Sequence, residues 1–150
     1  MDESLATAEA ARVHATCVIF GEAGILIRGR SGSGKTSLAR EIIAGAESLG
    51  TFARLVADDR VSLANRHGRL VACTPDSIAG RMEIFGRGIV AVTHEKSAVI
   101  RLVVDLEAAP SRWPDPDGEF VQLCGVMLPR LVTGPGSAAL MLLLKGLSKT

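Results

Sequence analysis

The sequence has few of the residues on which nucleic-acid and membrane surfaces depend. Aromatic residues make up 3% of the 150 residues and Tyr is absent, which leaves little material for stacking bases. Lys plus Arg number 17 and Asp plus Glu number 16, so no excess of one charge attracts nucleic acid or an anionic membrane. We therefore expect neither a nucleic-acid partner nor a membrane partner.

Cysteine and long apolar runs are also scarce. Cys17, Cys73 and Cys124 stand far apart with no CxxC pair, which argues against a zinc site or a disulfide framework. We expect buried, reduced thiols in a cytoplasmic protein. The apolar run Ala138–Leu144 is too short to cross a bilayer, and residues 1–12 lack the pattern of a signal peptide.

Strand-like and helical segments, rich in Val, Ile, Leu and Ala, alternate along the chain. Val13–Phe20 and Gly24–Arg28 are β-rich runs around a hairpin turn, and Ser37–Leu49 has helical spacing with Gly50 as its stop. Further strands are predicted at 54–57, 61–64, 69–73, 97–106 and 120–128, with a loop at 109–118 and a last helix at 137–147. This alternation predicts an α/β fold, with a flexible lead over 1–12 and one domain over 13–150.

A glycine-rich turn follows the second β-rich run. Its sequence, Gly29-Arg30-Ser31-Gly32-Ser33-Gly34-Lys35-Thr36, fits the P-loop pattern G-x-x-x-x-G-K-[ST], with a strand before it and a helix after it. Glycines let backbone N–H groups and the helix N-terminus face phosphates. Lys35 would place its charge on the β and γ phosphates, and the Thr36 hydroxyl would ligate Mg²⁺.

Two aspartates follow the apolar strand that ends at Ala57. Asp58 and Asp59 would stand at the carboxyl edge of the sheet, where open α/β sheets bind ligands. Adjacent strand residues point to opposite sides, so the two carboxylates should have different roles, one in the chemistry and one in metal binding or structure. An ordinary Asx turn at a strand end is the alternative.

Three motifs in this order carry a family resemblance: the P-loop, Val56-Ala57-Asp58-Asp59, and Met82-Glu83-Ile84-Phe85-Gly86-Arg87-Gly88-Ile89. With His14 shortly before the first P-loop strand, the chain resembles HPr kinase/phosphorylase from about Val13 to Leu147. The resemblance implies a P-loop fold similar to phosphoenolpyruvate carboxykinase, with a mixed sheet and flanking helices. It also implies ATP- and Mg²⁺-dependent phosphorylation of a serine of the phosphocarrier protein HPr, phosphorolysis of phosphoseryl-HPr to pyrophosphate, and a homo-oligomer, usually a hexamer.

The same resemblance implies catalytic roles for individual residues. Asp58 matches the residue that takes the serine proton in the forward direction and returns it in reverse. His14 matches a partner that tunes or orients Asp58, Lys35 keeps its role on the phosphates, and Arg112 is the counterpart of a catalytic arginine.

The implied metal ligands are Thr36, Glu83 and Asp59, of which Asp59 is metal-associated or supports a ligand. The signature segment departs from the family with Phe85 in place of Arg and Arg87 in place of Leu. The late loop at 133–137 lacks the basic residues that serve dephosphorylation in longer members, so the resemblance supports the kinase activity more than the phosphorylase activity.

Two other functions stay open. A small-metabolite P-loop kinase usually carries an arginine-rich lid, which we do not find, and it would leave Glu83 unexplained. A non-catalytic ATP-binding sensor is compatible with the altered signature and the uncharged late loop. An Asp58→Ala variant separates them, because a kinase loses transfer but keeps nucleotide binding, whereas a sensor's partner response is largely unchanged.

Overall fold

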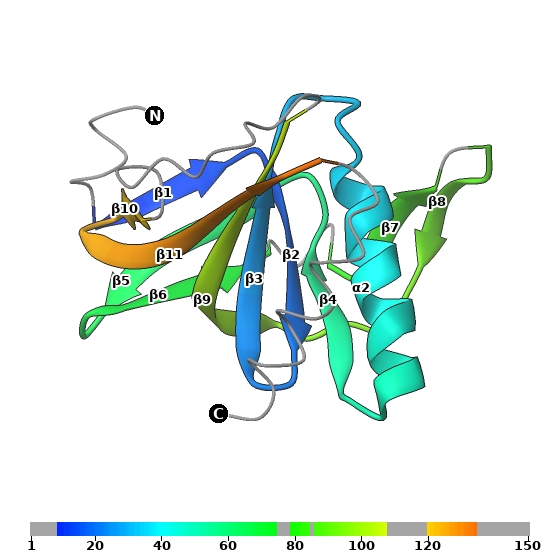
Figure 1. Cartoon of the computed structure of the whole chain (residues 1–150), viewed down its shortest axis with the longest axis horizontal. Coiled ribbons are helices and arrows are strands. Elements are labelled where there is room, and N and C mark those ends of the chain that lie inside the picture. The colour runs from blue at the N-terminus through cyan, green and yellow to red at the C-terminus, as the bar shows by residue number, and fades with distance from the viewer. Residues whose placement is uncertain (1–8, 75–78, 85, 108–119, 135–150) are drawn as a thin grey trace.

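The computed structural model describes residues 9–74, 79–84, 86–107 and 120–134, which form eleven strands and one helix. In chain order these are β1 (Ala10–Val13), β2 (Ala15–Phe20), β3 (Ala23–Arg28), α2 (Lys35–Leu49), β4 (Ala53–Ala57), β5 (Val61–Arg66), β6 (Arg69–Cys73), β7 (Arg81–Ile84), β8 (Gly88–Ala91), β9 (Ser97–Leu106), β10 (Phe120–Leu123) and β11 (Val126–Thr133). Nine strands form one curled mixed sheet, β7 and β8 form a separate hairpin, and α2 packs on one face of the sheet (Figure 1).

The ten-residue strand β9 organises the sheet because it has three neighbours. Its first residues pair antiparallel with β6, its last residues pair in parallel with β11, and its other edge pairs in parallel with β3. The sheet continues from β3 through β2 to β4, and from β6 through β5 to β1. Because parallel strands end at the same edge, the ends of β3, β9 and β11 lie together, at Arg28, Leu106 and Thr133.

The sheet has a buried layer on each face. The central strands β2 and β3 are buried along almost their whole length, as their continuously apolar sequences predict. The first layer packs beneath α2 and contains Phe20 and Ile27, and the second, on the opposite face, contains Leu26 and Leu63. Full burial of each such side chain contributes about 1.5–3 kcal/mol of transfer free energy.

Helix α2 forms where the apolar residues recur at helical spacing. Leu38 and Ile42 are buried against the sheet, and Ile43 is partly buried against the same cluster. The helix ends at Gly50, whose left-handed φ of 68° lets its N–H reach the carbonyls of Ala46 and Glu47. Its 15 residues are too few and too polar for a membrane span, and no other helix occurs among the described residues.

Most predicted elements are confirmed, and two local predictions are wrong. Residues 10–12, expected in the flexible lead, belong to β1, because they pair antiparallel with the edge of β5. The single strand expected over 120–128 is a hairpin, since Cys124 (φ 51°) and Gly125 (φ 78°) form a two-residue turn between β10 and β11. Positive φ at both turn residues is the geometry of a type I′ turn. Such turns usually have the sequence Asn-Gly or Asp-Gly, so Cys-Gly did not predict one.

Some predictions fall outside the described residues, and one of the cysteine predictions needs correction. The proline-containing loop at 109–118, the last helix at 137–147 and residues 1–8 of the lead are not described. Cys17 and Cys124 are buried and Cys73 is exposed, so the expectation of three buried thiols is wrong for Cys73. Alternation along β6 turns its side chain outward. Burial raises the pKa of the Cys17 thiol.

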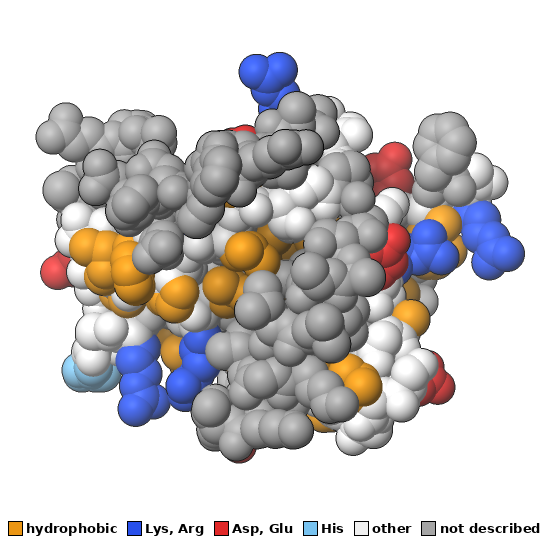
Figure 2. Space-filling model, viewed as in Figure 1, with side chains coloured by type: hydrophobic (Ala, Val, Ile, Leu, Met, Phe, Trp, Pro, Cys, Tyr) orange, Lys and Arg blue, Asp and Glu red, His pale blue; other side chains and the backbone are white. Residues whose placement is uncertain are grey.

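Apolar side chains are also exposed at one end of the sheet. In the view of Figure 2, hydrophobic side chains gather over β10 and β11. Phe120 and Met127 are the large ones exposed there, at 55% and 62%. Strand alternation explains the pattern, because the neighbouring positions Val121 and Leu128 point into the core instead.

An ion-pair cluster joins the three parallel strands β3, β9 and β11 in their carboxyl-terminal halves. Asp105 on β9 receives Nε and Nη2 of Arg28 on β3, both at 2.7 Å, and Nε of Arg130 on β11. Burial raises the pKa of Asp105, but hydrogen bonds and charge from the two arginines lower it more, so the pKa lies below its ordinary value. The cluster therefore stabilises the sheet edge from which the glycine-rich loop departs.

We expect Asp105→Asn to lower the free energy of unfolding at pH 7 by about 2–3 kcal/mol, because it weakens hydrogen bonds to a partly buried charge. A depressed folded-state pKa adds stability that is fully present above the unfolded value, near 3.8, and is lost as pH falls through the folded value. Urea unfolding should thus show a smaller difference between the variant and the unmodified chain at pH 3.

Glu107→Gln is the matched control, since it removes one carboxylate from an exposed position just beyond the same strand. It should change the free energy of unfolding by less than about 0.5 kcal/mol. Equal losses in the two variants would mean that the arginine cluster adds nothing specific.

Candidate functional site

The loop Gly29–Thr36 runs from the end of β3 into the start of α2. Gly29 is closely packed, because an added Cβ would lie 2.4 Å from Ser33 Oγ and 3.2 Å from Ser33 Cβ. Gly32 and Gly34 have φ of 81° and 104°, where L side chains are strained. Gly34 caps α2 without a side-chain hydrogen bond, so the N–H groups of the first helical turn face the loop.

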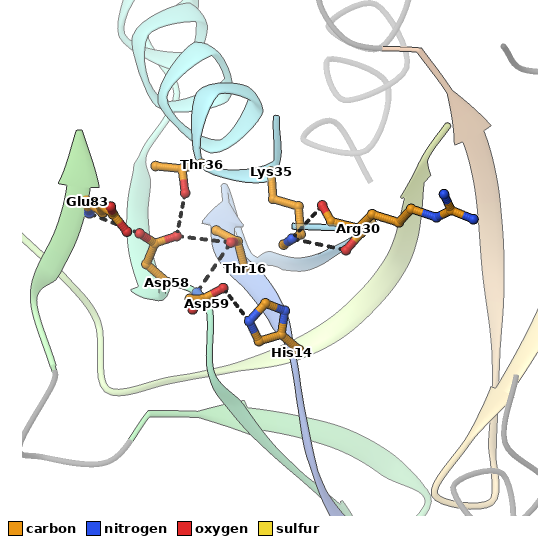
Figure 3. A network of polar contacts seen from close by, with 9 residues as sticks. His14, Thr16, Arg30, Lys35, Thr36, Asp58, Asp59 and Glu83 are labelled. Carbon is orange, nitrogen blue, oxygen red and sulfur yellow. Dashed lines mark hydrogen bonds and ion pairs between the residues drawn. The ribbon is translucent and has the colours of Figure 1, made fainter. Parts of the chain in front are cut away.

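Lys35 lies beneath the loop and is 6% exposed. Its Nζ donates to the carbonyls of Gly29 (3.0 Å) and Arg30 (3.1 Å). Two backbone acceptors thus satisfy a buried ammonium and hold the loop wrapped around it. The Arg30 side chain points away from this centre (Figure 3).

The carboxylate of Asp58 gathers donors from three separate elements. Its Oδ1 accepts Thr36 Oγ1 of α2 at 2.9 Å and Thr16 Oγ1 of β2 at 3.0 Å. Its Oδ2 accepts the backbone N–H of Glu83 of β7 at 3.1 Å. Asp58 therefore ties the end of β4 to the glycine-rich loop and to the β7–β8 hairpin (Figure 3).

The neighbouring Asp59 turns to a different partner. It has a left-handed φ of 71°, and its Oδ1 lies 2.8 Å from His14 Nε2, with the two side chains 58% and 56% exposed. Because both aspartates follow the end of β4, the backbone turn at Asp59, not strand alternation, separates their directions. The contact of His14 with Asp59 also differs from the expected pairing of His14 with Asp58.

Beside the two aspartates lies a cavity of about 200 Å³. Its lining residues are Asp58, Asp59, Arg60, Arg81, Glu83 and Ile89. Ile89, on β8, is 71% exposed. The cavity places two arginines and an apolar side chain next to the carboxylates.

The acidic residues do not form a metal cage by themselves. Within the part of the chain that the structure describes, no group of three or more His, Cys, Asp or Glu side chains could hold a metal ion. Glu83, predicted as a ligand, approaches Asp58 through its backbone N–H. A cation at this site would therefore need oxygens from elsewhere.

The sequence singled out the glycine-rich loop, the two aspartates and His14, but it did not point to Thr16. Thr16 is fully buried and its hydroxyl donates a hydrogen bond to Asp58. The feature of the sequence that could have indicated this role is a lone hydroxyl in the apolar strand Ala15–Phe20, two residues after His14. Arg112, the predicted catalytic arginine, lies outside the described residues.

The fold and the site define an α/β domain with a mixed sheet and a glycine-rich loop beside two aspartates. Residues 5–114 match the family described as the HPr serine kinase C-terminal domain. The chain is 33% identical over 135 residues to the HPr kinase/phosphorylase of Clostridium beijerinckii, covering 80% of this chain and 41% of the relative. It is 37% identical over 105 residues to that of Clostridium acetobutylicum, covering 64% and 32%.

The solved structure of the Hpr(Ser) kinase/phosphatase from Coxiella burnetii has the same fold, with a TM-score of 0.68 at 24% identity over 93% of this chain and 94% of that one. The chain therefore belongs to the HPr serine kinase C-terminal domain family. It spans about two fifths of the length of the Clostridium beijerinckii relative.

We expect Gly29→Ala to lower the free energy of unfolding by about 1–3 kcal/mol through overpacking against Ser33. Ser33→Ala alone should be neutral or slightly stabilising, because its buried Oγ has no hydrogen-bond partner among the described residues. The double variant should lose less stability than Gly29→Ala, since the closest atom is gone. Additive losses measured by urea unfolding would contradict this account of the loop.

Proposed function

We propose that the chain is a kinase that transfers the γ-phosphoryl group of ATP, with Mg²⁺, to a serine of an HPr-type phosphocarrier protein. The observation that carries this proposal is the contact between Thr36 and Asp58, which joins the start of α2 to a carboxylate at the edge of the sheet. Membership of the family supports the choice of acceptor, because the similar proteins are named HPr kinase/phosphorylase.

The residues of the glycine-rich loop suit the binding of a nucleoside triphosphate. Lys35 is buried under the loop with its ammonium on backbone carbonyls, from which it can turn to phosphate oxygens. Ser33 Oγ is buried without a partner among the described residues, so it is a donor available inside the loop. Together with the N-terminus of α2, these groups favour a P-loop that binds ATP.

The polar residues beside the loop suit Mg²⁺ bound together with a nucleotide. Mg²⁺ usually takes one or two protein ligands, several waters and substrate phosphates, rather than a protein cage. The Thr36 hydroxyl can offer a lone pair to the ion while its O–H donates a hydrogen bond to Asp58. We propose Thr36 as a direct ligand and Glu83 as a contributor near it, and the ion would neutralise phosphate charge during transfer.

Asp58 is the proposed proton acceptor. Its Oδ1 is held by two hydroxyls, and its Oδ2 takes one backbone N–H, which leaves a lone pair on Oδ2 for the acceptor hydroxyl. The serine oxygen forms a bond to the γ-phosphorus, the bond from that phosphorus to the leaving ADP breaks, and the serine proton moves to Asp58. In phosphorolysis an oxygen of inorganic phosphate forms a bond to the phosphorus of phosphoserine, and the bond from that phosphorus to the serine oxygen breaks. Protonated Asp58 gives its proton to the serine oxygen, pyrophosphate leaves, and the proton lost by the attacking phosphate replaces the one on Asp58.

Asp59 and His14 form the outer pair of the proposed site. Their contact supports an orienting role for Asp59 more than direct metal binding, because its carboxylate faces His14. Both side chains are more than half exposed, so an acceptor protein can reach them. The cavity lined by Arg60, Arg81 and Ile89 offers a place for the residues around the acceptor serine. The cytoplasmic location, the homo-oligomer and the single domain over 13–150 stay predictions.

The decisive measurement is transfer from γ-labelled ATP to purified HPr in the unmodified chain, Lys35→Ala, Asp58→Asn and Asp59→Asn. Lys35→Ala should weaken ATP binding about 10- to 100-fold, because a charge-assisted contact is lost. Asp58→Asn should keep ATP binding and lose about 10²–10⁴-fold in transfer. Asp59→Asn should keep more activity than Asp58→Asn.

Each contrary outcome has a distinct meaning. ATP binding without transfer to HPr in the unmodified chain would overturn the kinase and favour a nucleotide sensor. Loss of transfer in Asp59→Asn with activity kept in Asp58→Asn would exchange the roles of the two carboxylates.

The metal assignment predicts a contrast between two substitutions at one position. Thr36→Val should raise the Mg²⁺ concentration needed for half-maximal transfer at least about tenfold, because a direct ligand is lost. Thr36→Ser keeps the hydroxyl and should stay close to the unmodified chain. If both variants showed the same dependence of transfer on Mg²⁺ concentration, Thr36 would not be a ligand of the ion.

A further inference from the structure

Thr16 is a buried hydroxyl that touches both aspartates. It is 0% exposed in β2, and among the described residues only Lys35 is another buried polar or charged side chain. Its Oγ1 lies 3.0 Å from Asp58 Oδ1 and 3.5 Å from the backbone N of Asp59. Because the N–H of Asp59 can only donate, Oγ1 accepts there and gives its single proton to the carboxylate.

These two contacts constrain different parts of the site. Rotation about the last bond of an Asp side chain is broad and nearly two-fold, so one donor leaves the carboxylate free to turn. Thr16 and Thr36 bond to the same oxygen, Oδ1, from different elements. They leave Oδ2 to accept the N–H of Glu83, and Asp58 also lines the cavity.

The second contact acts on the backbone. Asp59 has the left-handed φ of 71° that turns its carboxylate to His14, and this conformation is uncommon for residues with a Cβ. The bond from its N–H to Thr16 is long, but it is made to a fully buried oxygen on a central strand. A rigid strand thus holds the point where the chain turns from one aspartate to the next.

We propose that Thr16 is a positioning residue, whose hydroxyl fixes the carboxylate of Asp58 and the backbone of Asp59 for phosphoryl transfer. This inference rests on the proposed function, in which Asp58 takes the serine proton. Among the described residues Thr16 has no hydrogen bond to the glycine-rich loop and does not line the cavity, so its loss should act on the rate of transfer and leave nucleotide affinity almost unchanged.

Thr16→Val and Thr16→Ser test the proposal at one position. Valine keeps the shape and removes the hydroxyl, whereas serine keeps the hydroxyl. We expect Thr16→Val to lower kcat about 10- to 100-fold, as a small misplacement of a reacting group does. Its affinity for ATP should stay within about twofold, and Thr16→Ser should restore kcat to within about threefold of the unmodified chain.

The split between kcat and KM distinguishes positioning from simple structural support. Loss of the contact from Thr16 to Asp58 should lower kcat for each folded molecule and leave KM for ATP and for HPr within about twofold. A valine variant with unchanged kcat for each folded molecule, but a lower free energy of unfolding, would overturn the proposal.

Two measurements on the chain alone keep this test separate from the kinase test. In Thr16→Val, hydrogen exchange at the Asp59 amide should become faster, and the carboxyl ¹³C chemical shift of Asp58 at pH 7 should move from its position in the unmodified chain. If the unmodified chain transfers no phosphate but both signals change, the proposed function fails while the positioning by Thr16 stands. If neither signal changes, the positioning role is excluded whatever the activity.

Discussion

The parallel pairing of β3 with β9 is the constraint on which the site depends. Parallel strands cannot be joined by a tight turn, so the chain between them must travel away and return. That excursion contains α2 on one face of the sheet and β4 next to β2. It brings the residues after β4 back to the end of β3, where the glycine-rich loop begins. The meeting of Thr36 with Asp58 is the local result of this path.

Around this meeting point, each charged group has an arrangement of neighbours that suits its burial. Lys35 is almost fully buried and is satisfied by two carbonyls of its own loop. Asp58 is partly buried and is satisfied by two hydroxyls and one N–H. Asp59 and His14 remain half exposed and satisfy each other. The exposure of the charged groups thus increases from Lys35 in the interior, through Asp58, to Asp59 and His14 at the surface.

The local features of the sequence predicted much of the fold and site. The β2–β3 hairpin, α2 with its Gly50 stop, and the loop with the two aspartates are encoded by short patterns, and the structure places them as expected. Features that depend on contacts distant in sequence were not accessible in this way. The pairing of β1 with β5, the division of one β9 edge between β6 and β11, and the partner of His14 are examples.

Two misses have specific physical causes. Cys124 has a left-handed backbone conformation that is unusual for cysteine, so the sequence of the β10–β11 hairpin resembles that of a single strand. Thr16 carries a single hydroxyl in a strand whose other residues are apolar. The hydroxyl acquires its partner only in the folded chain, where the end of β4 brings Asp58 next to it and to Thr36 of α2. Secondary-structure propensity depends on the residue type, whereas the turn at Cys124 and the hydrogen bonds of Thr16 depend on neighbours that are distant in sequence.

The cluster of Arg28, Asp105 and Arg130 has an evolutionary consequence. One carboxylate serves two arginines on two different strands, so a change at position 105 leaves two cations without this partner, while a change at either arginine leaves the other contact in place. The three positions are therefore unequal, because only Asp105 takes part in the contacts with both arginines. Arg28 directly precedes Gly29, so these contacts connect β11 with the residue before the glycine-rich loop. In related chains we expect a carboxylate at position 105 wherever positions 28 and 130 are both arginine.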